Sequence, residues 1–203
     1  QIHMPNFSHG TAGVAYALVR IGAATGDSKL LHAGKDGAEW LIENAVVDGE
    51  GLKWAANDRQ PVYMGGWCHG PVGTGRLFLL LAAVTGEARY REIAEKGARF
   101  VVDYAANAEQ AGKDGEKPYV PPSYCCGVAG VVDFFCDLSR KWKNGQSVPG
   151  GPVAASSTDH NVDLMLGAAG EALALLRLMT IDRAVDPVRG LPDRTVTGPA
   201  AKK

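Results

Sequence analysis

Residues 9–41 read "HGTAGVAYALVRIGAATGDSKLLHAGKDGAEWL", and the pattern of this segment returns 60 residues later (69 − 9). "HGPVG" at residues 69–73 repeats its opening, and "TGEARYREIAEKGARFV" at residues 85–101 repeats its second half. Two further Gly-x-x-Gly elements follow, "CGVAG" at 126–130 and "LGAAG" at 166–170. The chain is therefore built from repeats of one supersecondary unit.

Each repeat predicts a helical hairpin. The residues after the two glycines are almost all apolar, as in "VGTGRLFLLLAAV", so we expect a first helix that is buried on most sides. The Thr-Gly-acidic element predicts a turn, with Asp27 or Ser28, and Glu87, at the start of a second helix. The second helix has charges on one face, so we expect it on the outside. Glycines at i and i+3 leave a flat patch that favours close approach of the first helices.

A ring of inner helices inside a ring of outer helices, an all-α α/α toroid, accounts for this pattern. The alternative is a helical solenoid, whose repeats are shorter and give no reason for Gly, His and Cys at every inner N-terminus. We expect one domain over residues 1–203, a partial ring of about four repeats that forms the C-terminal portion of a longer chain. The inner helices should begin near four glycines and point toward a common centre: Gly10, Gly70, Gly127 and Gly167.

The third repeat is shorter than the first two. Only 40 residues separate Gly127 from Gly167 (167 − 127), which leaves no room for a full outer helix. The segment at 141–163, rich in Pro, Gly and Ser, predicts a loop or flexible lid. We expect Asp159 and His160, which lie within it, to be solvated loop residues.

Composition excludes several classes of function. A formal net charge of −1 gives no basis for a nucleic acid or an anionic membrane as the main partner, and the apolar stretches are too short to span a bilayer. Four cysteines without a visible secretory signal favour a cytoplasmic setting, in which metal binding or catalysis is more common than a disulfide framework. The chain begins at Gln1 without an initiator Met, so we expect missing upstream sequence.

Cysteine and histidine gather at the starts of the inner helices. Cys68 lies in "GGWCHGPVG", the pair Cys125 and Cys126 takes the equivalent place one repeat later, and His9 takes it one repeat earlier. The loops that lead into the inner helices of a toroid converge at one end, so we expect these side chains to meet. A disulfide between the two adjacent cysteines would be strained and rare. Cys136, inside "VVDFFCDL", is expected in the core.

Three cysteines favour zinc. Thiolates are soft ligands that select zinc over magnesium or calcium. Structural zinc sites have four protein ligands, whereas catalytic sites have three and keep the fourth position open. Three assembled cysteines therefore indicate a catalytic Zn²⁺.

The segments "NFSHGTAG", "GGWCHGPVG", "YCCGVAG" and "LMLGAAGEALALLRL" resemble the lanthionine synthetase C-like (LanC) family over nearly all 203 residues. The resemblance implies an α/α toroid with zinc at the tops of the inner helices, held by Cys68, Cys125 and Cys126. Most members have Cys-His-Gly where this chain has Cys-Cys-Gly, and the chain is similar to a subgroup with three cysteine ligands. His9 matches the acid/base candidate of the family, and His69 follows the first ligand, where members have Tyr or His.

The resemblance implies lanthipeptide biosynthesis. A zinc-bound peptide cysteine would add to dehydroalanine or dehydrobutyrine in a dehydrated precursor peptide, and His9 or His69 would protonate the enolate. Alternatives are addition of glutathione to dehydrated residues in proteins, and a non-catalytic zinc-binding or peptide-binding module. An upstream dehydratase domain or protein is an expected partner. The family also has a basic residue near the first cysteine ligand, for which Lys53 and Arg59 are the candidates.

Overall fold

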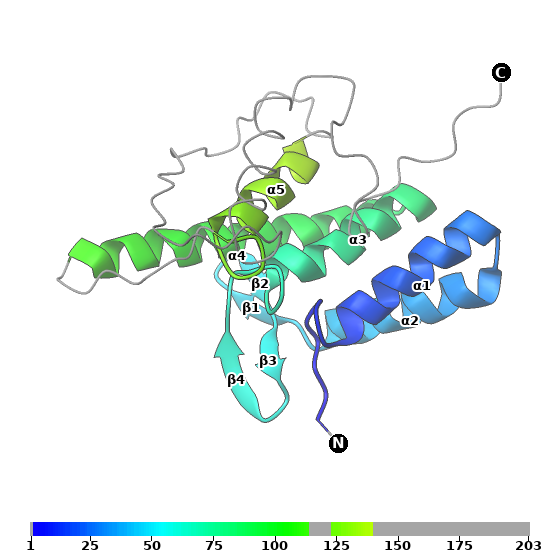
Figure 1. Ribbon diagram of the computed structural model, residues 1–203, viewed down its shortest axis with the longest axis horizontal. Coiled ribbons are helices and arrows are strands. Elements are labelled where there is room, and N and C mark those ends of the chain that lie inside the picture. Colours follow the sequence, from blue (N-terminus) through cyan, green and yellow to red (C-terminus); the bar gives the residue numbers. More distant parts are fainter. Residues whose placement is uncertain (1, 114–122, 140–203) are drawn as a thin grey trace.

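Helices make up most of the described part of the chain, which in this computed structural model comprises residues 2–113 and 123–139 (Figure 1). The elements follow in the order α1 (Thr11–Thr25), α2 (Ser28–Glu43), β1 (Val46–Asp48), β2 (Gly51–Lys53), β3 (Ala55–Asn57), β4 (Gln60–Tyr63), α3 (Pro71–Thr85), α4 (Ala88–Lys113) and α5 (Val128–Ser139). The fold of these described residues is all-α, as predicted, with short strands between α2 and α3.

The predicted helix starts are confirmed wherever the structure describes them. Helix α1 begins directly after Gly10 and α3 directly after Gly70, and in both cases the glycine is the extended N-cap residue. Helix α5 begins directly after Gly127. The fourth predicted start, at Gly167, lies outside the described residues, as does the predicted loop at 141–163 with its Asp and His residues.

The turn inside each hairpin is the same in both complete repeats. Gly26 and Gly86 end α1 and α3 in the left-handed region, with φ of 75° and 76°. The hydroxyls of Thr25 and Thr85 accept the N–H of the acidic residue two positions later, at 3.4 and 3.1 Å. Asp27 then caps α2, since its Oδ1 accepts two backbone N–H groups of the first turn, at 2.9 and 3.3 Å.

The helices separate into an inner and an outer set. Helix α1 packs against α3, and α3 packs against α5, while α2 packs on α1 and α4 packs on α3. Figure 1 shows α1 paired with α2. Every residue of α3 from 71 to 81 is buried, as expected of an inner helix. The outer helices join through charged side chains, since Arg89 Nη2 lies 2.6 Å from Glu39 Oε1.

The glycines at the helix starts make room for the loop that leads into each helix. A Cβ at Gly13, Gly73 or Gly130 would collide with the carbonyl oxygen six residues earlier in the chain. We predicted that these glycines would lie against a neighbouring inner helix. They lie instead against the backbone of the loop that leads into their own helix. Close approach of inner helices occurs two residues after Gly73, where a Cβ at Gly75 would lie 2.6 Å from the ring of Phe134 in α5.

Two β-hairpins connect α2 to α3, and the sequence analysis did not predict them. Strands β1 and β2 pair in antiparallel fashion around a two-residue turn that contains Gly49, at φ 56°. Strands β3 and β4 pair around a second turn, in which Asn57 Oδ1 accepts the Arg59 N–H at 2.9 Å. Between the hairpins the buried Trp54 donates its Nε1–H to the Leu41 carbonyl at 2.7 Å, which fixes this connection to α2.

The second hairpin also holds the N-terminal segment. Asn6 donates from Nδ2 to the Ala56 carbonyl at 3.0 Å, and Asp58 donates its N–H to the His3 carbonyl at 3.0 Å. These bonds hold the loop that enters α1. Within the described residues, no helix combines the length and apolar character needed to cross a membrane.

Candidate metal centre

Backbone hydrogen bonds join the loops that precede the inner helices. The Cys68 carbonyl accepts the N–H groups of Phe7 and Ser8, at 3.2 and 3.3 Å. One repeat later, the Cys125 carbonyl accepts the N–H groups of Trp67 and Cys68, at 2.9 and 3.1 Å. The two pairs occupy equivalent positions, so the predicted convergence of these loops follows from the repeat itself.

Aromatic side chains support the same arrangement. The rings of Phe7 and Trp67 lie 5.2 Å apart between centroids, and those of Trp67 and Tyr124 lie 6.2 Å apart. Each ring comes from the equivalent position of its repeat. Because Trp67 directly precedes Cys68 and Tyr124 directly precedes Cys125, the packed rings fix the backbone beside both cysteines.

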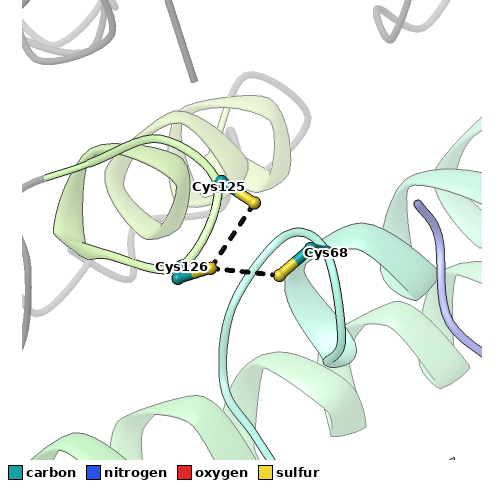
Figure 2. Close-up of side chains that lie close together, drawn as sticks. All are labelled: Cys68, Cys125 and Cys126. Carbon is teal, nitrogen blue, oxygen red and sulfur yellow. Dashed lines mark hydrogen bonds between the residues drawn. The ribbon is translucent and has the colours of Figure 1, made fainter. Parts of the chain in front are cut away.

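The three predicted cysteines meet with their sulfurs facing one another (Figure 2). The Cys126 sulfur lies 3.2 Å from that of Cys68 and 3.4 Å from that of Cys125. All three sulfurs lie within 4.8 Å of one another. The cysteines are free thiols, and a disulfide would need sulfurs about 2.05 Å apart, so the adjacent pair is not bridged.

The three clustered cysteines differ in their exposure to solvent. Cys68 is buried, Cys125 is half-buried and Cys126 is exposed. Burial raises the pKa of the Cys68 thiol far above its ordinary range, and burial also raises the pKa of Cys125 to about 11. Both thiols therefore hold their protons at neutral pH unless a cation stabilises the thiolates.

The donor set fits a soft divalent metal. Tetrahedral zinc with Zn–S bonds of about 2.3 Å requires sulfurs about 3.8 Å apart, so the observed 3.2 and 3.4 Å need only small side-chain adjustments. These three cysteines form the group of metal-ligating side chains found among the described residues. Cys68, Cys125 and Cys126 are thus able to hold a metal ion, and the exposed position of Cys126 leaves that side open.

The fourth cysteine lies apart from this cluster. Cys136 is buried within α5, at 2% exposure, and does not belong to the group of facing sulfurs. This agrees with the prediction that it belongs to the core.

The two candidate histidines lie next to each other. His9 and His69 occupy equivalent positions in successive repeats, and their ring centroids are 5.7 Å apart. His9 is exposed and His69 is half-buried. Burial, together with the charge of His9, lowers the pKa of His69. Neither ring belongs to the sulfur group, and Asn6 Oδ1 accepts the His9 N–H at 3.1 Å, which fixes its backbone.

The two candidate basic residues lie in the hairpins. Lys53 places its Nζ 2.6 Å from Asp48 Oδ2 of β1 and 4.3 Å from the centroid of the Tyr63 ring of β4, so its ammonium group is engaged between the two hairpins. Arg59 is exposed in the turn between β3 and β4.

Sequence reasoning missed a set of charged residues behind the cysteines. Arg76 of α3 lies 2.6 Å from Asp133 and 2.8 Å from Asp137, both of α5. Arg76 and Asp133 are almost completely buried, at 1% and 0% exposure of their side chains. The signal was present in the sequence, because each of these charges interrupts an otherwise apolar helix.

Comparison with known proteins gives one match. A family model described as "Lanthionine synthetase C-like protein" matches residues 5–148 of the chain. This range includes both cysteine loops and both histidines. Searches of curated proteins and of solved structures gave no significant match.

Proposed function

The chain belongs to the lanthionine synthetase C-like family, and from this membership we propose that it is a zinc-dependent cyclase that forms thioether rings in a dehydrated precursor peptide. The observation that supports the proposal is the meeting of the Cys68, Cys125 and Cys126 sulfurs within 4.8 Å. The family fold is an α/α toroid, and the three cysteines lie at the starts of its inner helices.

The three cysteines would hold zinc, which supplies an open position where a substrate thiol is bound and kept as a nucleophilic thiolate. The burial of Cys68 closes the inner side of the site, while the exposure of Cys126 leaves an approach from solvent. A peptide cysteine therefore reaches the cluster from the Cys126 side. Its sulfur forms a bond to the β-carbon of dehydroalanine or dehydrobutyrine, and the alkene electrons move toward the carbonyl group.

The resulting enolate must receive a proton at its α-carbon. His9 and His69 stand one repeat apart with ring centroids 5.7 Å apart, and His69 is joined to Cys68 by one peptide bond. The lowered pKa of His69 makes it a ready proton donor whenever it is protonated, and His9 lies exposed beside it. We assign the proton transfer to this pair.

The substrate proposed is a peptide that contains both a cysteine and a dehydrated residue. Dehydration of Ser or Thr must precede this step, so a dehydratase domain or protein is the proposed source of substrate. Glutathione would offer the same thiol chemistry without a ring, and the experiment below separates the two nucleophiles.

The test uses a synthetic peptide with one cysteine and one dehydroalanine. Ring closure leaves the mass unchanged and removes the thiol, so it is measured as loss of alkylation by N-ethylmaleimide, followed by fragmentation to locate the thioether. A second reaction contains glutathione and a dehydroalanine peptide without cysteine, where addition increases the mass. Zinc-loaded protein should accelerate ring closure over the uncatalysed rate, and the Cys126→Ala variant should not. If the zinc-loaded protein accelerates only glutathione addition, or neither reaction, the cyclase proposal is wrong.

A further inference from the structure

A buried ion pair joins the two helices that begin at the cysteine loops. Helix α3 begins three residues after Cys68 (71 − 68), and α5 begins two residues after Cys126 (128 − 126). Arg76 of α3 places Nη2 2.6 Å from Asp133 Oδ2 of α5, and its Nη1 lies 2.8 Å from Asp137 Oδ2. One guanidinium group therefore binds two carboxylates of the neighbouring inner helix.

The same carboxylate oxygen reaches the cysteine loop. Asp133 Oδ2 accepts a hydrogen bond of 2.6 Å from the hydroxyl of Tyr124, which is buried and directly precedes Cys125. The Tyr124 ring packs beside Trp67, which directly precedes Cys68. A continuous set of contacts thus runs from the ion pair to the backbone of two of the three cysteines.

An ion pair at this place has a cost that hydrophobic packing would avoid. Arg76 and Asp133 occupy equivalent positions of successive repeats, each six residues after the first glycine (76 − 70 and 133 − 127). The equivalent position of α1 is Tyr16, which is also buried. Burying charges incurs a large desolvation penalty, and an apolar replacement is often equally stable. Apolar side chains at these positions would serve the packing of α3 and α5 equally well. A directional ion pair also fixes the position of one helix start relative to the other, which apolar packing does less strictly.

We propose that Arg76, Asp133 and Tyr124 are positioning residues that hold Cys125 in register with Cys68, so that the cysteines share one metal ion. The proposal rests on the metal site of the proposed function. All three lie outside the group of facing sulfurs, so their role is to position it. Removing the Tyr124 hydroxyl should loosen the Cys125 loop while the ring packing stays intact.

The decisive variant is Tyr124→Phe, measured by titration of the metal-free protein with Co²⁺. Thiolate ligation gives a sulfur-to-cobalt charge-transfer band, whose growth reports affinity and whose position reports geometry. Loss of an outer hydrogen-bond partner typically costs about 10- to 100-fold in metal affinity. We expect a loss of that size in Tyr124→Phe.

The matched control is Tyr90→Phe. Tyr90 is also fully buried, and its hydroxyl donates to Glu39 Oε1 at 3.0 Å, in the contact between α2 and α4. Its replacement should leave the cobalt affinity and spectrum unchanged. Urea unfolding of both metal-free variants separates positioning from stability. If Tyr124→Phe binds cobalt like the wild type, or if the two variants lose affinity in proportion to stability, the positioning role is wrong.

A second readout does not depend on metal. In metal-free protein, the N–H groups of Trp67 and Cys68 donate to the Cys125 carbonyl, so their hydrogen exchange reports the register of the two loops. Exchange at these amides should increase in Tyr124→Phe and stay unchanged in Tyr90→Phe. Failure of the wild type to bind cobalt would contradict the proposed metal site, while unchanged exchange in Tyr124→Phe would contradict the positioning role.

Discussion

The Cys125 carbonyl accepts a hydrogen bond of 3.1 Å from the N–H of Cys68, so two of the three clustered cysteines are joined through the backbone. One repeat earlier, the Cys68 carbonyl accepts the N–H of Ser8 in the same way, at 3.3 Å. The repeat places the loops side by side, and the residue types at equivalent positions then decide whether a metal site forms. Ser8 stands where the second and third repeats have Cys68 and Cys125, so the first of the described loops contributes no sulfur to the cluster.

Replacing Gly73 with Ala should destabilise the protein. A Cβ there would collide with the Trp67 carbonyl and would lie 2.6 Å from the Phe7 Cβ, and both groups belong to packed backbone or buried core. Overpacking of this kind costs about 1–3 kcal/mol. Urea unfolding of the metal-free protein measures the change.

Gly97→Ala is the control for that experiment. Gly97 lies in α4, and the nearest atom to an added Cβ is the Pro71 Cβ at 3.1 Å, a tight contact that needs only a small shift of the neighbour and involves no backbone carbonyl. The gain in helix propensity, about 1 kcal/mol, offsets it. Equal destabilisation by the two substitutions would show that the loop carbonyl does not fill the space beside Gly73.

His9→Asn and His69→Asn should slow thioether formation while the metal stays bound. A well-placed acid/base group typically contributes about 10²- to 10⁴-fold, so each variant should lose rate within that range if each histidine takes part in proton transfer. Rate on a dehydroalanine peptide and zinc content are measured on the same samples. Loss of zinc from His9→Asn would make His9 a ligand and contradict a site of three cysteines.

The contact between the outer helices should depend weakly on pH. The hydrogen bond from Arg89 lowers the pKa of Glu39 below its ordinary value of 4.5. A lowered folded-state pKa means that this contact stabilises the protein above about pH 4.5 and stops doing so as the pH falls through the folded-state pKa. Both side chains are more than one-third exposed, so the contribution is below about 1 kcal/mol.

Comparing the wild type with Glu39→Gln measures this contribution. The difference in unfolding free energy should be small at pH 7 and should disappear as the pH falls through the lowered folded-state pKa of Glu39. A difference that grows as the pH falls would contradict the assignment to the Arg89 contact.

The helical part of the fold was predictable because its signals are local. An apolar run after each Gly-x-x-Gly element predicts a buried helix, and the turns at Gly26 and Gly86 use glycine at a left-handed φ of 75° and 76°. The hairpins at 46–63 were missed, because strands of three or four residues have too few positions to show alternation. Gly49 was the available signal, since glycine at the first position of a two-residue loop, here Gly49-Glu50, is typical of a hairpin turn.

The cysteines of the candidate site were predictable, but their surroundings were not. The positions of Cys68, Cys125 and Cys126 before equivalent glycines were enough to predict that their side chains meet. The pairing of Arg76 with Asp133 depends on which faces of α3 and α5 oppose each other, and sequence spacing does not specify that. The different burial of the three sulfurs likewise depends on how neighbouring loops pack.

The most direct test of the account is the zinc content of the purified protein and of two cysteine variants. We predict one zinc ion per chain, with three protein sulfurs at about 2.3 Å by X-ray absorption spectroscopy. Cys125→Ala should lose the metal, and Cys136→Ser, which changes a buried cysteine outside the cluster, should keep it. A wild-type protein without zinc after growth with ample zinc, or stoichiometric zinc in both variants, would contradict the metal site on which the proposed function depends.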